Sequence, residues 1–253
     1  MTGFGRSIET LHLKGSLAAM SDALRYISCQ SLITWTLEET LSRSHSSPQT
    51  SNWTECFEAL STCVESVKHV AITQCPSYNY TFLYALIAPL YGLRNLEVFE
   101  LKNGQLTTSE IDFLALISAF PKLRQLSLPD LCGGSCPPVS VLWKPSIMPP
   151  TLEELRFCCF IDGRSAQLPA DLKDVKIDRS VAHHGLRRLS ISSLFRQISD
   201  HDVIHLARLL NSAYPNLDVV EGYGPNARNG YESWSRVDLF RAALRDIRCE
   251  MRK

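Results

Sequence analysis

Two histidines one helical turn apart are the first residues whose types and spacing could support chemistry. His201 and His205 stand four positions apart in the string HDVIH, so a helix would place both imidazoles on one face. Such a pair could chelate a zinc ion, with the acid between them as general base. That acid is Asp202, one methylene shorter than glutamate, and no third ligand follows. We therefore expect Asp202 to cap a helix, and we predict no metal site.

The nine cysteines offer a second kind of chemistry. Cys132 and Cys136 flank a Gly-Gly-Ser segment and could form a redox pair or half of a metal site. No second pair lies at the spacing of a zinc ribbon. An odd number of cysteines without a secretory signal favours reduced thiols. Cys158 and Cys159 are adjacent, so in a strand one would face the core and the other the opposite side.

Two further strings contain residue types that occur in functional sites, but the residues around them do not complete a site. His183 and His184 precede Gly185, and we expect both imidazoles to be solvated in a loop. The string GYGP at 222–225 lacks the third glycine and the helix start of a phosphate-binding loop. Nothing in the sequence combines a nucleophile, a base and a group that orients the base. We therefore predict that the chain is not an enzyme and needs no cofactor.

A repeated apolar string would position the remaining polar side chains. The pattern Leu-x-x-Leu-x-Leu, with apolar substitutions, begins at residues 8, 32, 67, 96, 123, 152, 172, 186 and 217. Most of the spacings fall near the roughly 20–29 residues of leucine-rich repeats. The last two apolar positions alternate with polar ones, which predicts a strand with one face in a core. No repeat can bury that face alone, so neighbouring repeats must stack.

Helical patterns lie between most of these strands. They span residues 16–27, 55–64, 81–91, 107–119 and 199–213. Thr107 with Glu110, and Ser199 with Asp202, have the spacing of helix capping boxes. The strings at 172 and 186 are only 14 residues apart, which leaves no room for a helix between them.

Two segments interrupt the pattern and a third closes it. Residues 42–52 are serine-rich, and residues 130–150 are rich in proline, so we expect two long loops, the second of which could act as a lid. Residues 233–253 are expected to form a helix that caps the last repeat. The sequence thus predicts an α/β fold in a single domain, residues 1–253. It would be an irregular right-handed leucine-rich-repeat solenoid of about nine repeats, similar to the ribonuclease-inhibitor horseshoe, with parallel strands on the concave face and helices on the convex face.

The polar positions of the strands would line the concave face. Charges of both signs alternate along it, whereas a nucleic-acid surface would show a one-sided basic stripe. The pattern favours a protein or peptide partner and no nucleic acid, although any single position could simply keep an exposed sheet hydrated. The candidate partner-binding residues are His12, Lys14, Glu38, Glu100, Lys102, Glu154, Arg156, Lys176, Arg188 and Glu221.

Charge and hydropathy exclude other classes of protein. The chain has 26 Lys plus Arg and 26 Asp plus Glu, so it has no net charge to steer it onto nucleic acid or an anionic membrane. Its charge-free stretch at 72–93 holds two prolines and several polar residues and is too polar to span a bilayer. No basic and apolar leader opens the sequence. We expect an intracellular monomer, cytoplasmic or nuclear, that makes no membrane contact.

Several strings carry a resemblance to a known family. LARLLNSAYPNLDVVEGY at 206–223 and the later Trp234-Ser235-Arg236-Val237 look like the end of fungal, basidiomycete-type F-box leucine-rich-repeat proteins. The strings FPKLRQLSL and MPPTLEELRF are typical of the same repeats. In that family an F-box docks on a cullin ubiquitin ligase and the repeats capture the substrate. No F-box precedes the repeat at Ile8, so the resemblance implies the substrate-binding part alone.

The sequence leaves three functions open. The first is non-catalytic protein–protein recognition, similar to substrate recognition by the repeats of F-box ubiquitin-ligase adaptors. The second is a metal- or thiol-dependent enzyme or sensor that uses His201 and His205, or Cys132 and Cys136. The third is a stand-alone repeat scaffold, or a gene remnant that still folds. We favour the first because the repeat pattern is strong and no catalytic set is complete.

Overall fold

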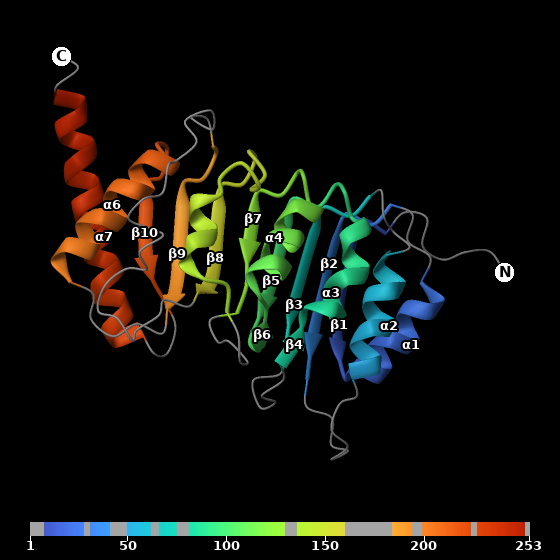
Figure 1. Ribbon diagram of the computed structural model, residues 1–253. Coiled ribbons are helices and arrows are strands. Elements are labelled where there is room, and N and C mark those ends of the chain that lie inside the picture. Colours follow the sequence, from blue (N-terminus) through green and yellow to red (C-terminus); the bar gives the residue numbers. More distant parts are fainter. Residues whose placement is uncertain are drawn as a thin grey trace.

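The repeated strings form one open parallel sheet. The computed structural model describes residues 8–27, 31–40, 50–61, 66–74, 81–129, 136–159, 184–193, 199–223 and 227–250. The eight strands lie side by side in chain order (Figure 1). They are β1 (Thr10–Gly15), β2 (Thr34–Glu39), β3 (His69–Thr73), β5 (Val98–Lys102), β7 (Gln125–Ser127), β8 (Glu154–Cys159), β9 (Arg188–Ser193) and β10 (Val219–Gly222). All neighbouring strands pair in parallel, so the predicted α/β fold with a parallel sheet is confirmed.

One backbone contact recurs at the start of the strands and keeps them in register. The residue after the first apolar position of a string donates its N–H to the carbonyl of the equivalent residue in the string before it. Lys68 donates to Ile33 at 2.9 Å, Glu97 to Lys68 at 2.7 Å, and Arg124 to Glu97 at 2.7 Å. The series continues through Glu153, Arg187 and Asp218. The contact does not depend on the length of the connecting segment, so repeats of unequal length still align.

The apolar positions of the strings share one side of the sheet and form the core. From the string at 32 onward, all of them within the described residues are buried, Trp35, Phe99 and Phe157 being the largest. Ile8, Leu11 and Leu13 of the first string are only partly buried, because β1 has a neighbour on one side only. The alternation of apolar and polar residues therefore decides which face of each strand is inside.

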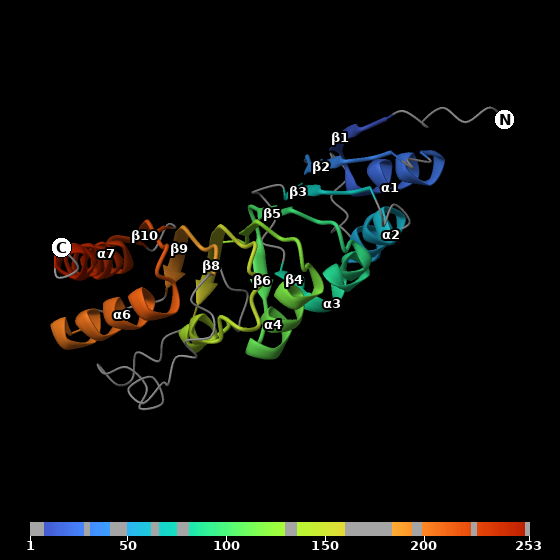
Figure 2. The same cartoon turned by 90° about the horizontal axis from the view of Figure 1, so that it is seen from above.

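The helices cover the apolar side of the sheet. They are α1 (Leu17–Tyr26), α2 (Thr50–Ser61), α3 (Tyr84–Ile87), α4 (Glu110–Ala119) and α6 (Asp200–Ala213), with short 3-10 helices η1 (Ala88–Gly92) and η2 (Val139–Trp143). Seen from above, these five α-helices lie on one side of the row of strands, and the row curves so that its other side is concave (Figure 2). We call this uncovered side the open face. It is made of the polar strand positions.

Two helix starts test the predicted caps. Ser199 caps α6 as predicted, since its Oγ accepts from the N–H of Asp202 at 3.2 Å and donates to the carboxylate at 2.7 Å. The predicted box of Thr107 and Glu110 is wrong: Ser109 caps α4 and Asp112 completes the box. Thr107 belongs to β6 (Gln105–Thr107), which pairs with β4 (Thr81–Leu83) in a separate two-stranded sheet.

Other predicted boundaries also shift. The helix predicted at 81–91 is wrong: this segment forms β4, the single turn α3 and η1. Pro89 stands in the first turn of η1, a position where proline is favoured, so a separate short helix begins there. Helix α2 begins at Thr50, inside the loop predicted at 42–52, and α7 (Ala227–Glu250) begins before residue 233. Helix α7 packs against α6 and β10 and buries Trp234 and Val237.

The described part of the proline-rich segment at 130–150 is not an exposed loop. Helix η2 buries Val139, Val141, Leu142 and Trp143, and Met148 beyond it is buried as well. The hydroxyl of Tyr214, after α6, donates to the Leu142 carbonyl at 2.7 Å. These side chains fill the core between β7 and β8, as a helix would, so residues 139–148 cannot serve as the lid that the sequence suggested.

The sheet contains no strand between β8 and β9. Glu154–Cys159 pair directly with Arg188–Ser193, so the predicted strand of the string at 172 does not stand in the row. Residues 160–183 lie outside the described part of the chain. The short spacing to the string at 186 provides the physical reason, because a parallel neighbour needs a crossover of a dozen residues or more.

Candidate functional site

The open face brings together polar residues from the C-terminal half of the sheet. Strand register aligns Glu100, Ser127, Arg156, Ser190 and Glu221 in one row across β5, β7, β8, β9 and β10. Successive side chains of a strand alternate between faces, so this whole row points away from the helices. The row is continuous although its members are up to 121 residues apart in sequence (221 minus 100).

The open face is hollowed around this row. A depression of about 270 Å³ is lined by Glu100, Lys102, Gln125, Leu126, Ser127, Glu154, Leu155, Arg156, Arg188, Ser190 and Glu221. Six predicted partner-binding residues, Glu100, Lys102, Glu154, Arg156, Arg188 and Glu221, are therefore brought together. A second depression of about 240 Å³ shares Lys102, Ser127 and Arg156 and extends to Asn103 and Pro129. We call the two depressions together the groove.

Most charges in the groove already have a partner. Lys102 Nζ lies 2.7 Å from Glu100 Oε2, and Gln125 Nε2 donates to Glu100 Oε1 at 3.1 Å. Arg188 NH1 lies 3.6 Å from Glu154 Oε1. Glu221, the third carboxylate of the groove, accepts a hydrogen bond from Ser190 Oγ at 2.7 Å. The Lys102–Glu100 pair lies within β5, and the other contacts join side chains of neighbouring strands.

Arg156 contacts an aromatic ring, unlike Lys102 and Arg188, which pair with carboxylates. Its guanidinium carbon lies 3.9 Å from the centre of the Tyr223 ring, and the Tyr223 hydroxyl donates to the Leu128 carbonyl at 3.2 Å. Within the described residues no carboxylate pairs with Arg156, whose side chain is exposed. Tyr223 therefore orients a cation in the groove without neutralising it.

The other predicted residues lie apart from the groove. Glu38 contacts Lys14 Nζ at 2.5 Å and His12 Nε2 at 3.6 Å, at the β1–β2 end of the sheet. The hydrogen bond from Lys14, aided by the charges of Lys14 and His12, lowers the pKa of Glu38. Strand β3 separates this cluster from the groove with Ala71 and Thr73. Lys176 falls outside the described residues, and its expected place between β8 and β9 does not exist.

A second set of charges escaped the sequence analysis. The residues that make the recurring backbone contact alternate in sign: Lys68, Glu97, Arg124, Glu153, Arg187 and Asp218. Lys68 pairs with Glu97 at 3.0 Å and Arg124 pairs with Glu153 at 2.8 Å. The hydrogen bond from Lys68 is the main cause that lowers the pKa of Glu97. The sequence does carry a signal for these charges: in each of these strings a charged residue directly follows the first apolar position.

The described histidine candidates are not part of a metal-ligand group. The His201 side chain is exposed and lies 3.7 Å from Asp202, whose carboxylate serves the cap of α6. In the described ranges no three His, Cys, Asp or Glu side chains are grouped as metal ligands would be. His183 is outside these ranges, and His184 is fully buried, so the expectation that it is solvated is wrong. The apolar pocket against Tyr214 explains this burial and lowers the pKa of His184 to about 4.

One of the described cysteines differs from the expectation of reduced thiols. Cys136 is disulfide-bonded, while Cys56, Cys158 and Cys159 are thiols. Cys132 lies outside the described residues. The adjacent pair behaves as predicted, because Cys159 is in the core and Cys158 points toward Cys136. Burial raises the pKa of Cys56 to about 12 and that of Cys159 well above its ordinary value, which keeps both unreactive.

The string GYGP is split by the end of the sheet. Gly222 closes β10, Tyr223 contacts the groove, and residues 224 and 225 lie outside the described part.

Among the helices that the structure describes, none is both long and apolar enough to cross a membrane. Comparison of this chain with protein-family models, with curated proteins and with solved structures finds no match.

Proposed function

We propose that the chain is a leucine-rich-repeat solenoid whose concave face recognises a protein or peptide. On this reading residues 1–253 are one domain, and the open face corresponds to the substrate-binding surface of F-box ubiquitin-ligase adaptors. Three features support the solenoid: one strand per repeat, strand order equal to chain order, and helices on one side only. Unequal repeat lengths and the direct β8–β9 pairing make it an irregular one.

The uncovered polar face supports a binding role. Helices bury one side of the sheet, and nothing in the described chain covers the groove on the other. The groove is lined mainly by polar and charged side chains, whereas small-molecule pockets are lined predominantly by apolar and aromatic ones. Such a surface fits an extended polypeptide better than a metabolite. Extended concave surfaces of this kind are what repeat proteins use for recognition.

The single observation that carries the proposal is the state of Arg156. Its guanidinium is oriented by Tyr223 but has no carboxylate partner in the described residues, whereas Lys102 and Arg188 have one each. A guanidinium presents paired donors that match a carboxylate in a bidentate contact. Ser127 and Ser190 flank Arg156 in the same row and add hydroxyl groups beside it. We infer that the partner inserts an acidic side chain or a C-terminal carboxylate at Arg156.

Peptide selection tests this inference without knowledge of the partner. A phage-displayed library of random peptides is panned against the immobilised protein, and the selected peptides are titrated onto wild type and variants by fluorescence anisotropy. We expect enrichment of Asp- and Glu-containing peptides and a loss of affinity of about tenfold or more in Arg156→Ala, since charged hydrogen bonds contribute about 1.5–3 kcal/mol.

Arg124→Ala is the matched control. Arg124 has the same side chain, precedes the neighbouring strand β7 and pairs with Glu153, but it does not line the groove. Its substitution should leave affinity within about twofold, as expected for a surface charge away from the contact. Equal losses in the two variants, or selected peptides that contain no acidic residue and bind equally well when their C-terminus is amidated, would contradict an anionic contact at Arg156.

A further inference from the structure

Helix α7 closes the row of strands and exposes large apolar side chains on its outer face. It packs against α6 and β10, and no described element lies beyond it (Figure 2). Val237 and Arg241 are buried on the inner side, whereas Leu239, Phe240 and Ile247 are 69%, 36% and 52% exposed. A helix that caps a solenoid normally turns a polar face outward. An apolar outer face on the last helix therefore points to a surface that another molecule covers.

The residues on this outer face are arranged symmetrically about the middle of the exposed stretch. Arg236, Leu239, Ala243, Ile247 and Glu250 follow one another at steps of three or four residues, which places them along one side of the helix. Leu239 and Ile247 stand four residues before and after Ala243, and Arg236 and Glu250 stand seven residues before and after it. An isologous contact between two identical surfaces requires this kind of symmetry.

We propose that a second copy of this chain docks on α7, so that the two α7 helices pack antiparallel about a twofold axis at Ala243. Leu239 of one copy then packs against Ile247 of the other, and Phe240 lies at the edge of the same contact. Ala243 at the centre has a small side chain, so the two helices can approach each other closely. The pairing covers the apolar side chains that α7 exposes in the single chain.

The charges at the two ends of this face favour an antiparallel pair of copies. Arg236 of one copy meets Glu250 of the other, whereas a parallel pair would oppose Arg236 to Arg236 and Glu250 to Glu250. Glu250 is exposed and has no ion-pair partner within the described residues. Arg236 contacts Asp200, whose side chain is 81% exposed, so its guanidinium would bridge two carboxylates in the dimer.

An anionic membrane fits this face less well than a second copy. Asp246 and Glu250 stand beside the apolar side chains and would be repelled by anionic lipids. A dimer through α7 departs from the monomer expected from the sequence. It does not depend on the proposed function, because no residue of this face lines the groove. One helix from each copy makes a small interface, so we expect a dissociation constant on the order of 10 μM.

Sedimentation equilibrium of the full chain measures this association directly. We expect the weight-average mass to rise from 28.4 kDa toward twice that value as the concentration increases from about 1 to about 200 μM. Non-reducing gel electrophoresis of the same samples distinguishes this association from disulfide-linked dimers. A mass that stays at 28.4 kDa throughout would overturn the proposal, and this result does not depend on any variant.

Two exposed isoleucines show whether the contact is on α7. Ile247→Glu places a charge in the apolar contact of both copies and should raise the dissociation constant by at least about thirtyfold, as loss of a hot-spot residue does. Ile111→Glu is the matched control, because Ile111 is 79% exposed on α4, away from α7 (Figure 2). Its substitution should change the dissociation constant by less than about twofold. Equal dissociation constants for the two variants would overturn the assignment to α7.

Charge reversal tests the antiparallel orientation. Glu250→Arg and Arg236→Glu each oppose like charges across the dimer and should weaken self-association by about threefold or more. An equimolar mixture of the two variants restores both pairs, so the mixed dimer should form more tightly than either variant associates with itself. A mixture that associates no more tightly would overturn the antiparallel contact. Arg236→Glu also loses the contact with Asp200, so circular dichroism checks its fold, and Glu250→Arg alone remains a test if that fold is lost.

Discussion

The guanidinium of Arg156 lies over the ring of Tyr223, 3.9 Å from its centre, and joins strand β8 to the residue that follows β10. The Tyr223 hydroxyl reaches further and donates to the Leu128 carbonyl after β7, 95 residues away in sequence. One side chain after the last strand therefore spans β9 and β8 across the open face. This contact should both stabilise the C-terminal repeats and orient the cation of the groove.

The coupling between these two residues can be measured. A double-mutant cycle of Arg156→Ala and Tyr223→Ala, followed by urea unfolding, should give a coupling free energy of about 0.5–1 kcal/mol, as for exposed cation–π pairs. Tyr223→Phe keeps the ring and loses only the hydroxyl, so this variant should preserve the coupling. The pair Arg124→Ala and Tyr223→Ala should be additive because these residues share no contact. Coupling that disappears in Tyr223→Phe would assign the effect to the hydroxyl.

The strand faces could be predicted from the sequence, and the contacts across the sheet could not. The alternation in strings such as LEELRF determines that Leu155 and Phe157 are buried and that Arg156 is on the open face. Nothing local to residue 156 or 223 indicates that the two meet, because their contact depends on which strands are neighbours. Leaving out one predicted strand, that of the string at 172, changes the neighbours of β8 and β9 without changing either pattern.

Capping and burial show the same limit. Thr107 has the residue type and spacing of a helix cap, but pairing with Leu83 in the small sheet assigns it to a strand, and Ser109 takes the role. His184 has the neighbours of a loop residue, but the packing of Tyr214 against it forms a buried site. Propensity is a local quantity, and in both places tertiary contacts decide the outcome.

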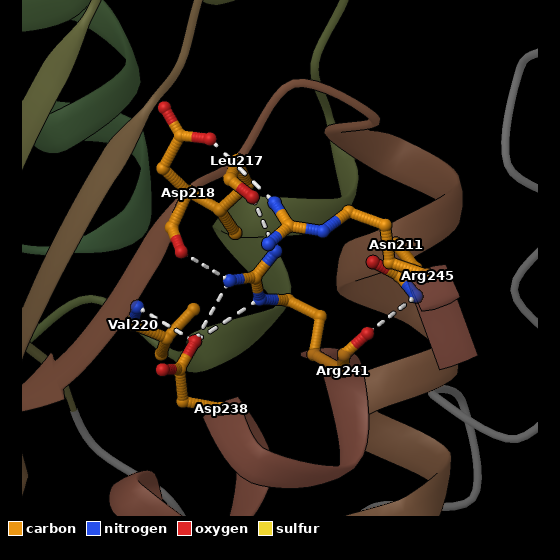
Figure 3. A network of polar contacts seen from close by, with 7 residues as sticks. All are labelled: Asn211, Leu217, Asp218, Val220, Asp238, Arg241 and Arg245. Atoms are coloured by element: carbon orange, nitrogen blue, oxygen red, sulfur yellow. Dashed lines mark hydrogen bonds and ion pairs between the residues drawn. The ribbon is translucent and has the colours of Figure 1, made fainter. Parts of the chain in front are cut away.

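Arg241 of α7 should be one of the most sensitive positions for stability. Its buried guanidinium donates to the carbonyls of Leu217 and, at 2.5 Å, of Asp218, and lies 2.8 Å from Asp238 Oδ1 (Figure 3). Asp238 also accepts from the N–H of Val220 at 3.1 Å, so the network attaches α7 to the edge strand β10. Arg241→Met should lower the free energy of unfolding by about 3–5 kcal/mol, because it leaves these buried acceptors unpaired.

Arg245, one turn later on the same helix, is the control for Arg241. It lies 3.6 Å from Asp218 Oδ1 and its side chain is 43% exposed. Arg245→Met should change the free energy of unfolding by less than about 1 kcal/mol, as for exposed ion pairs. Urea unfolding monitored by circular dichroism measures both variants. Equal effects at the two positions would show that the network in Figure 3 does not hold α7 against β10.

A side chain at Gly185 should destabilise the folded chain. An added Cβ would lie 2.7 Å from the Pro150 carbonyl oxygen, the same atom that accepts from the Gly185 N–H at 3.1 Å. Because the obstacle is backbone, Gly185→Ala should destabilise the chain by about 1–3 kcal/mol, the usual range for overpacking. Gly15 has no atom within 4 Å of the equivalent position, so Gly15→Ala should be neutral or slightly stabilising in the same thermal or urea titration. A neutral Gly185→Ala would mean that the segment before β9 can move away from Pro150.

His184 should make stability depend on pH in a window above that of the carboxylates. The side chain is fully buried, accepts from the Leu186 N–H at 3.2 Å through Nδ1, and packs edge-on against Tyr214. Burial lowers its pKa from 6.5 to about 4, so the folded chain holds the neutral form. Below pH 6.5 the unfolded chain binds a proton that the folded chain does not, and stability falls until the pH reaches about 4.

The size of this fall follows from the two pKa values. Between about pH 7 and pH 5 the unfolded state gains most of one proton, which lowers the free energy of unfolding by about 2 kcal/mol. Glu38 and Glu97 have pKa values lowered from 4.5, so the stability that they contribute is lost only as the pH falls below about 4.5. Their titration therefore does not obscure the range between about pH 7 and pH 5. In His184→Asn the amide oxygen can replace Nδ1 as acceptor without titrating, so urea unfolding should show the fall removed. His201→Asn, at an exposed site, should keep it. A fall that persists in His184→Asn would mean that another group takes up the proton.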